Sequence, residues 1–194
     1  MGRYATLLIV VGCGPPLAIH DDPDRRCPTG AVSLASQDDV ARLAACPVAS
    51  SIAMRTGAAL DLGPLARLEV IDGDLRVGPS VGLERLALPR LRSIAGTFRV
   101  VGNGNLRAVA LPALVRAGRI EIEGNVALTS VALPKLAAVD SLAIIGEPEL
   151  EMIDLSALAT VGELVIADNP KLVILEGPIA GVSARIEHNA MLAR

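Results

Sequence analysis

A short pattern of apolar, polar and apolar residues recurs along the chain at a nearly constant spacing. It occurs as IAM (52–54), LRV (75–77), FRV (98–100), IEI (120–122), LAI (142–144), LVI (164–166) and ARI (184–186). The last apolar residues of successive segments, from Met54 to Ile186, are 20 to 23 residues apart. Alternation over a few residues is typical of a β-strand with one buried face, so each segment predicts a short strand.

The residues that follow each segment keep the same period. A Leu lies six residues beyond each of these apolar residues (Leu60, Leu83, Leu106, Leu128, Leu150, Leu172 and Leu192). A second alternating segment then ends at Leu88, Leu111, Leu133 or Leu155. Such a short unit has no room for a long helix, and its period is typical of a chain that coils and stacks on itself. We therefore expect an all-β solenoid, a parallel β-helix of about seven coils of 20–23 residues.

The turn after the first strand of a unit often contains Asn. Asn103, Asn125, Asn169 and Asn189 occupy the same position of the repeat. Asn tolerates the left-handed backbone conformation and can bond to its own backbone, which suits a tight turn. Stacked in one column, these side chains can also form hydrogen bonds from coil to coil.

The two ends of the repeat differ in what precedes and follows them. Ser36 and Asp39 form a capping-box pattern, which predicts a short helix over 37–45 that closes the N-terminal end of the core. No comparable segment follows Leu192. Since an open sheet edge is usually blocked, we expect either a truncated family member or a partner, possible self-association included, that covers the C-terminal end.

Composition narrows the core and the chemistry. The chain is 52% hydrophobic but has one Phe, one Tyr and no Trp, so the interior must be aliphatic. A net charge of −3 gives no reason to expect nucleic acid as a partner. The sequence offers no metal-binding, phosphate-binding or serine-nucleophile motif, so we expect no catalytic residue, metal site or cofactor.

The first residues resemble an export signal. Residues 4–11 form an apolar run too short to cross a bilayer, which takes about 20 residues, but suited to a signal peptide over 1–12. VVGC (10–13) resembles a bacterial lipobox, which implies cleavage before Cys13 and lipidation of its thiol. The alternative is an incidental or buried Cys in an ordinary signal peptide. Gly14 after the Cys favours the outer membrane, by resemblance to Gram-negative lipoproteins.

Export would place the remaining cysteines in an oxidising compartment. Cys27 and Cys46 are then a natural disulfide pair, since Cys13 carries the lipid anchor. Residues 13–26, rich in Pro and charge, are expected to form the tether between the anchor and the domain.

The segments after the tether resemble a known family, the receptor L domain. The resemblance rests on CPTG (27–30), the short helix, Cys46 and coils of the form L-x-I-x-x-N-x-x-L-x-x-V-x-L-P-x-L-x-x-V, and it covers about residues 27–192 of a domain over 27–194. It implies a right-handed coil with a helix-and-disulfide cap, and a binding module with leucine-rich-repeat-like spacing. The 194 residues contain no Cys-rich segment, membrane-spanning segment or kinase, so hormone-receptor function is not implied.

One group of outward positions breaks the polar pattern. Ala143, Ile145, Val165 and Ala167 point outward by phase, are apolar, and neighbour one another on consecutive coils. Charged residues rim them (Glu121, Glu123, Arg185 and Glu187). The patch is either covered by side loops or a register irregularity, or it is a contact surface for a protein.

These observations predict a non-catalytic binding or structural module, lipid-anchored in the cell envelope, that recognises a protein or glycan partner. The alternative is a small carbohydrate-active β-helix enzyme, a lyase or hydrolase, with acidic and basic residues on an outward face. Arg99 and Glu121 should be neighbours there, but a single ion pair is more typical of a solvated sheet than of an active site.

Overall fold

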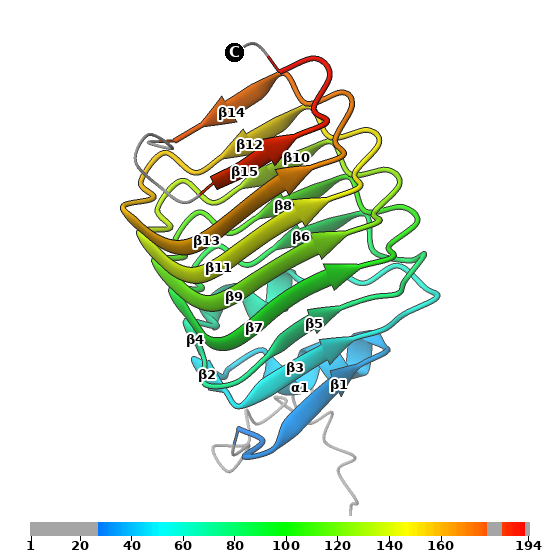
Figure 1. Ribbon diagram of the computed structural model, residues 1–194. Coiled ribbons are helices and arrows are strands. Elements are labelled where there is room, and N and C mark those ends of the chain that lie inside the picture. The colour runs from blue at the N-terminus through cyan, green and yellow to red at the C-terminus, as the bar shows by residue number, and fades with distance from the viewer. Residues whose placement is uncertain (1–26, 178–183, 193–194) are drawn as a thin grey trace, which may run out of the picture.

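The structure is a computed structural model that describes residues 27–177 and 184–192. The predicted signal peptide, Cys13 and the tether lie outside these residues. The described chain winds into a stack of coils whose strands form two parallel sheets on different sides of the stack (Figure 1). The all-β solenoid of about seven turns predicted from the repeat is therefore confirmed. Its right-handed sense stays a prediction.

The larger sheet has the order β1-β3-β5-β7-β9-β11-β13-β15. Its strands are β1 (Ala31–Leu34), β3 (Ser51–Met54), β5 (Leu75–Val77), β7 (Ser93–Val101), β9 (Arg116–Glu123), β11 (Ala138–Ile145), β13 (Thr160–Ala167) and β15 (Ala184–Glu187), with the short β2 (Val48–Ala49) and β4 (Val70–Ile71) beside them. The smaller sheet contains β6 (Arg85–Ala87), β8 (Ala108–Ala110), β10 (Ser130–Ala132), β12 (Met152–Asp154) and β14 (Ile174–Glu176). The helices are α1 (Gln37–Leu43) and the 3-10 helix η1 (Gly63–Arg67).

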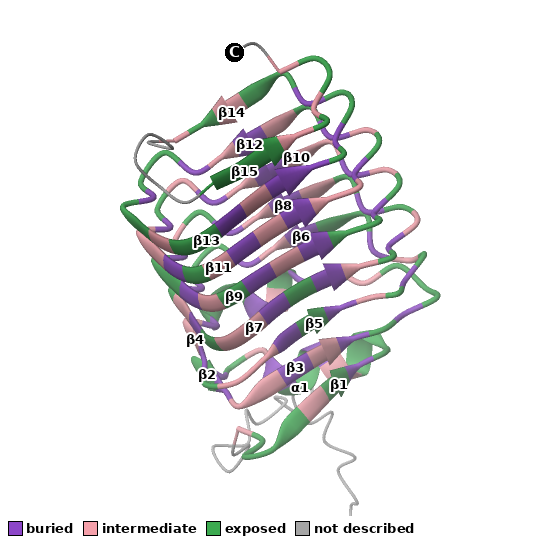
Figure 2. Cartoon of the chain, viewed as in Figure 1, coloured by how far each residue is buried: buried purple, intermediate pink, exposed green. Residues whose placement is uncertain are grey.

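Equivalent residues of neighbouring coils face one another along the long strands, apart from a shift of register between Ile94 and Thr97 of β7. Leu142 of β11, for example, is paired with Ile120 of β9 and with Leu164 of β13. Each inward column therefore places aliphatic side chains above one another, and Figure 2 shows the resulting alternation of buried and exposed positions along the strands. Among the described residues, Phe98 is the one aromatic side chain in the core, so the predicted aliphatic interior is confirmed.

The strands β7, β9, β11 and β13 are longer than the three residues expected. Each is eight or nine residues long because the segment before the alternating pattern also pairs within the larger sheet. The chain bends there, and the bend requires close backbone approach. A Cβ on Gly118 would lie 2.8 Å from the carbonyl oxygen of Ala95, so a side chain at this position would force the coils apart.

The helix predicted over 37–45 ends two residues early, at Leu43. The capping box is present: the Ser36 hydroxyl accepts a bond from the Asp39 amide, and the Asp39 carboxylate accepts one from the Ser36 amide. The helix adds Val40 and Leu43 to the core. It ends where the Cys46 amide bonds to the Leu43 carbonyl (2.9 Å), which turns the chain toward the disulfide and Pro47.

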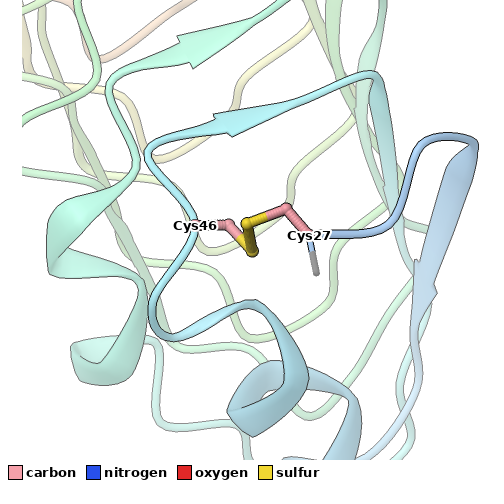
Figure 3. Close-up of a disulfide and its surroundings, with 2 residues drawn as sticks. All are labelled: Cys27 and Cys46. Atoms are coloured by element: carbon pink, nitrogen blue, oxygen red, sulfur yellow. A yellow bond between two sulfur atoms is a disulfide. The ribbon is translucent and has the colours of Figure 1, made fainter. Parts of the chain in front are cut away.

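The predicted disulfide between Cys27 and Cys46 is present (Figure 3). Its Cα atoms are 5.6 Å apart, a usual separation for this bond. It links the start of the described domain to the residues that follow α1, across 19 residues of sequence. Cys46 is buried in the core. The disulfide therefore holds Cys27, just before β1, against the N-terminal end of the stack.

The Asn column forms a ladder of hydrogen bonds through the stack. The amide N–H of Asn103 donates to the Asn125 Oδ1, and the amide N–H of Asn169 donates to the Asn189 Oδ1. The donor–acceptor distance is 3.1 Å in both bonds. The side-chain nitrogens donate to main-chain carbonyls, such as Asn125 Nδ2 to Val100 (3.1 Å). The predicted bonding from coil to coil is therefore confirmed.

The expected left-handed conformation, however, lies one position earlier than the Asn residues. Positive φ values occur in Gly102, Gly124, Gly146, Asp168 and His188, between 56° and 69°. The backbone reverses at this residue, which leaves the Asn amide and side chain free to bond along the stack. The prediction that Asn itself supplies the left-handed turn residue is thus wrong, because its side chain is needed as a buried donor and acceptor.

Replacement of Asn125 by Ala tests the ladder. It removes the partner of the Asn103 amide and side chain and leaves the Val100 carbonyl without its donor, all in a buried column. We expect the free energy of unfolding to fall by about 3 kcal/mol, measured by urea denaturation.

Asn105→Ala is the matched control, because Asn105 is exposed and its side-chain nitrogen donates one hydrogen bond, to the Val81 carbonyl. This variant should lose less than about 1 kcal/mol. Equal losses for the two variants would contradict a special role of the buried column.

Candidate functional site

The outward side of the larger sheet carries the candidate site residues. We call it the outer face and define it by two columns of side chains. The first column contains Ala53, Arg76, Arg99, Glu121, Ala143, Val165 and Arg185, in register from β3 to β15. In the second, Val101, Glu123, Ile145, Ala167 and Glu187 are in register from β7 to β15. Register therefore places the residues as the repeat predicted.

The predicted apolar patch is present in part. Ala143 is paired with Val165, and Ile145 with Ala167, so the four residues do neighbour one another. Ala143, Ile145 and Val165 are partly exposed, but Ala167 is only 1% exposed and presents almost no contact surface. The prediction that all four form an accessible patch is wrong for Ala167, because the larger Ile145 and Glu187 flank its short side chain on the neighbouring strands.

Charged residues dominate the outer face over β5, β7 and β9. Arg99 pairs with Glu121 at 2.9 Å, as expected from their adjacent strands, and Arg119 approaches the same carboxylate at 3.7 Å. Arg76 pairs with Asp74 at 2.6 Å. These side chains are partly exposed, so each pair contributes little to stability. Their main effect is to make the outer face over β5, β7 and β9 charged.

Among the described residues, three surface hollows are considered as places that could receive a ligand. The largest, about 580 Å³, lies at the bend of the long strands, where Asp72, Arg116 and Asp140 border small residues such as Gly118. A second, about 430 Å³, is lined around Asp61 and Glu84 near η1. The third, about 470 Å³, lies on the outer face among Arg55, Arg76 and Arg99. The third differs from the others because no acidic residue lines it.

Glu147 is a carboxylate within the Asn ladder that the recurring Asn pattern did not indicate. It occupies the ladder position of its coil and is fully buried. Its Oε2 accepts the Asn125 amide and its Oε1 accepts the Asn125 Nδ2, both at 2.9 Å, while its own amide donates to Asn169 (3.0 Å). The repeat spacing places Glu147 22 residues after Asn125, so a search of the column for any buried hydrogen-bonding residue would have found it.

Burial raises the pKa of Glu147 from 4.5 to about 7. The cost of removing a charged carboxylate from water is the main cause, and the nearby Glu123 charge adds to it. The bonds from Asn125 oppose the shift, since they stabilise the ionised form. The ladder therefore contains one group whose ionisation changes near neutral pH.

Other potential chemistry is sparse in the described part of the chain. Its residues include no group of three or more His, Cys, Asp or Glu side chains placed to hold a metal ion. His188 lies 3.1 Å from Asp168, with both side chains largely exposed at a turn. Among the same residues, no helix is long and apolar enough to cross a membrane.

The last described coil exposes several apolar side chains. Ile174, Ile186 and Met191 are exposed, with Met191 at 59%. They lie beside β14 and β15, at the C-terminal end of the stack in Figure 1. A partner at this end of the chain stays a prediction.

Comparison with known proteins finds no family model, no curated protein and no solved structure that matches the chain. The resemblance to the receptor L domain therefore rests on the repeat, the disulfide segment and the capping helix alone.

A pH series tests Glu147. The unfolded carboxyl has an ordinary pKa near 4.5 and the folded one about 7, so the folded state holds the proton more tightly. The resulting stabilisation is complete below pH 4.5 and is lost as the pH rises through 7. We expect the free energy of unfolding to fall by up to about 3 kcal/mol over this range.

Glu147→Gln should remove that pH dependence, because a side-chain amide does not titrate in this range, and it keeps one of the two acceptors that Asn125 uses. Glu149→Gln is the control, because Glu149 is a partly exposed carboxylate in the same turn. A Glu147→Gln protein with the pH profile of the wild type would show that Glu147 does not titrate in this range.

Proposed function

We propose that the chain is a non-catalytic binding module of the receptor L-domain kind, anchored by a lipid on Cys13 in the outer membrane of a Gram-negative cell envelope. There it binds a protein or glycan partner. One observation carries the proposal: strand pairing holds the outer face in register, and this face is divided into a charged zone over β5–β9 and an apolar zone over β11–β13. Such a surface suits contact with a partner.

Strand pairing favours binding over an extended surface. The outer-face side chains from β3 to β13 lie on strands that pair on both sides. Little backbone ordering is then needed when a partner binds, which lowers the entropic cost of association. The apolar zone, with Ile145 and Val165, lies toward the C-terminal end of the stack, where further apolar side chains are exposed. A partner or a second copy of the chain could contact both.

Labelling of cells with radioactive palmitate tests the anchor. We expect the wild-type protein to carry the label and to remain in the membrane fraction, because the lipobox-like VVGC directs acylation of Cys13. Cys13→Ala should lose both the label and the membrane association. Equal labelling of the two proteins would rule out Cys13 as the anchor.

Sedimentation and glycan assays test the binding function. We expect Ile145→Glu and Val165→Glu to weaken self-association or partner binding about tenfold or more, because each places a charge in the apolar zone. Val81→Glu is the matched control, since Val81 is an exposed Val outside the two columns of the outer face.

Incubation of the protein with a panel of polysaccharides separates binding from catalysis. Turnover of any substrate would favour the carbohydrate-active enzyme. A monomeric protein that binds no envelope protein or glycan, with the two outer-face variants unchanged, would contradict the binding module.

A further inference from the structure

Three arginines surround one hollow on the outer face. The hollow lies over β3, β5 and β7, has a volume of about 470 Å³, and is bordered by Arg55, Arg76 and Arg99. This volume falls within the usual range of small-ligand sites. Ala53, Pro79 and Val101 supply an apolar lining between the charges.

A close backbone approach beside the hollow fixes the spacing of two strands. Gly78, which follows β5, is one of the lining residues and has a φ of 104°, in the region that favours Gly. A Cβ at this position would lie 2.1 Å from the Val101 carbonyl oxygen. Any other residue would therefore displace β5 and β7, the strands that carry Arg76 and Arg99.

The charge of the hollow is positive although the chain has a net charge of −3. Arg76 and Arg99 are paired in register on adjacent strands, an arrangement of like charges that is unfavourable by itself. Asp74 and Glu121 offset it from outside the hollow, since neither lines it. Among the described residues, no ion pair is recorded for Arg55.

The arginines retain donors for a ligand. Arg76 reaches Asp74 through Nη2, and Arg99 reaches Glu121 through Nη1. A guanidinium has five N–H donors in a planar fork that matches a carboxylate or phosphate, so donors remain on both groups. Both side chains are at least half exposed, which lets them turn toward a ligand.

The composition of the chain favours an anionic rather than a neutral sugar. Neutral sugar rings are commonly held against aromatic side chains, but the chain has one Phe, one Tyr and no Trp, and Phe98 is fully buried. Charge is the main source of affinity that this hollow can offer. A compact cluster of three guanidinium groups suits one oxyanion-bearing unit, whose ring can lie against Pro79 and Val101.

We propose that Arg55, Arg76 and Arg99 form a binding site for a saccharide unit that carries a carboxylate or a phosphate. The proposal rests on the proposed function, because it names the chemistry of a glycan partner for the same outer face.

Titration calorimetry of the full chain, in a non-ionic polyoxyethylene detergent, tests the site. The probes are trigalacturonate for carboxylates, glucose 6-phosphate for phosphates, maltotriose as the neutral control and tri-aspartate as an acidic peptide. We expect one or both anionic sugars to bind at least tenfold more tightly than maltotriose, and to bind more weakly at high salt. The anionic sugar that binds identifies the source of the oxyanion.

Arg55→Gln and Arg76→Gln should each weaken that binding about fivefold to tenfold. Arg90→Gln is the matched control, because Arg90 is an exposed arginine outside the two columns of the outer face. It should bind as the wild type does.

Three results would overturn the site: no preference for either anionic sugar, tighter binding of tri-aspartate, or equal losses in all three variants. If maltotriose or a neutral polysaccharide bound in their place, the binding module would stand and the anionic site alone would fail.

Discussion

The structure depends on one constraint: each coil must offer the next coil the same backbone hydrogen bonds and the same side-chain positions. Parallel strands from β3 to β15 meet this constraint by pairing equivalent residues of successive coils. A substitution that changes the path of one coil would disturb both neighbours. This is why the inward columns repeat aliphatic residues of similar size and why Gly118 and Gly78, whose backbones approach a neighbouring coil closely, have no side chain.

The same constraint explains the buried polar column. Where the chain turns out of the sheet, its main-chain N–H and carbonyl groups lose their partners in the sheet. The buried ones then need other hydrogen-bond partners. Asn supplies a donor and an acceptor in one side chain, so Asn103, Asn125 and Asn169 bond to the turns on either side. Glu147 supplies acceptors at the same position, but its ionised form is costly there, which couples the ladder to pH. The ladder stops at Asn103, whose Oδ1 has no partner among the described residues.

The outer face is free of the rule that fixes the interior. Its side chains must fit the spacing between strands but need not resemble one another. Charged and apolar residues can therefore both occupy it. Arg76 and Arg99 are adjacent there despite their equal charge, with acids outside the hollow that they border. Surface arrangements that break a local rule at some cost in stability are expected at functional sites, and this is the physical argument for the proposed anionic sugar site.

The sequence by itself determined the solenoid, its inward columns and the capping box, because each follows from local spacing. The pairing of Cys27 with Cys46 followed instead from the assignment of Cys13 to the lipid anchor. A period of 22 residues fixes which residues are neighbours in the sheet, so the sequence alone predicts that Arg99 and Glu121 are adjacent. Only the tertiary structure decided the rest. The long bent strands, the burial of Ala167, the raised pKa of Glu147 and the hollow beside Arg55 depend on the volume and solvent exposure that neighbouring coils leave. These quantities arise between coils, and a repeat pattern specifies neighbours but not the space between them.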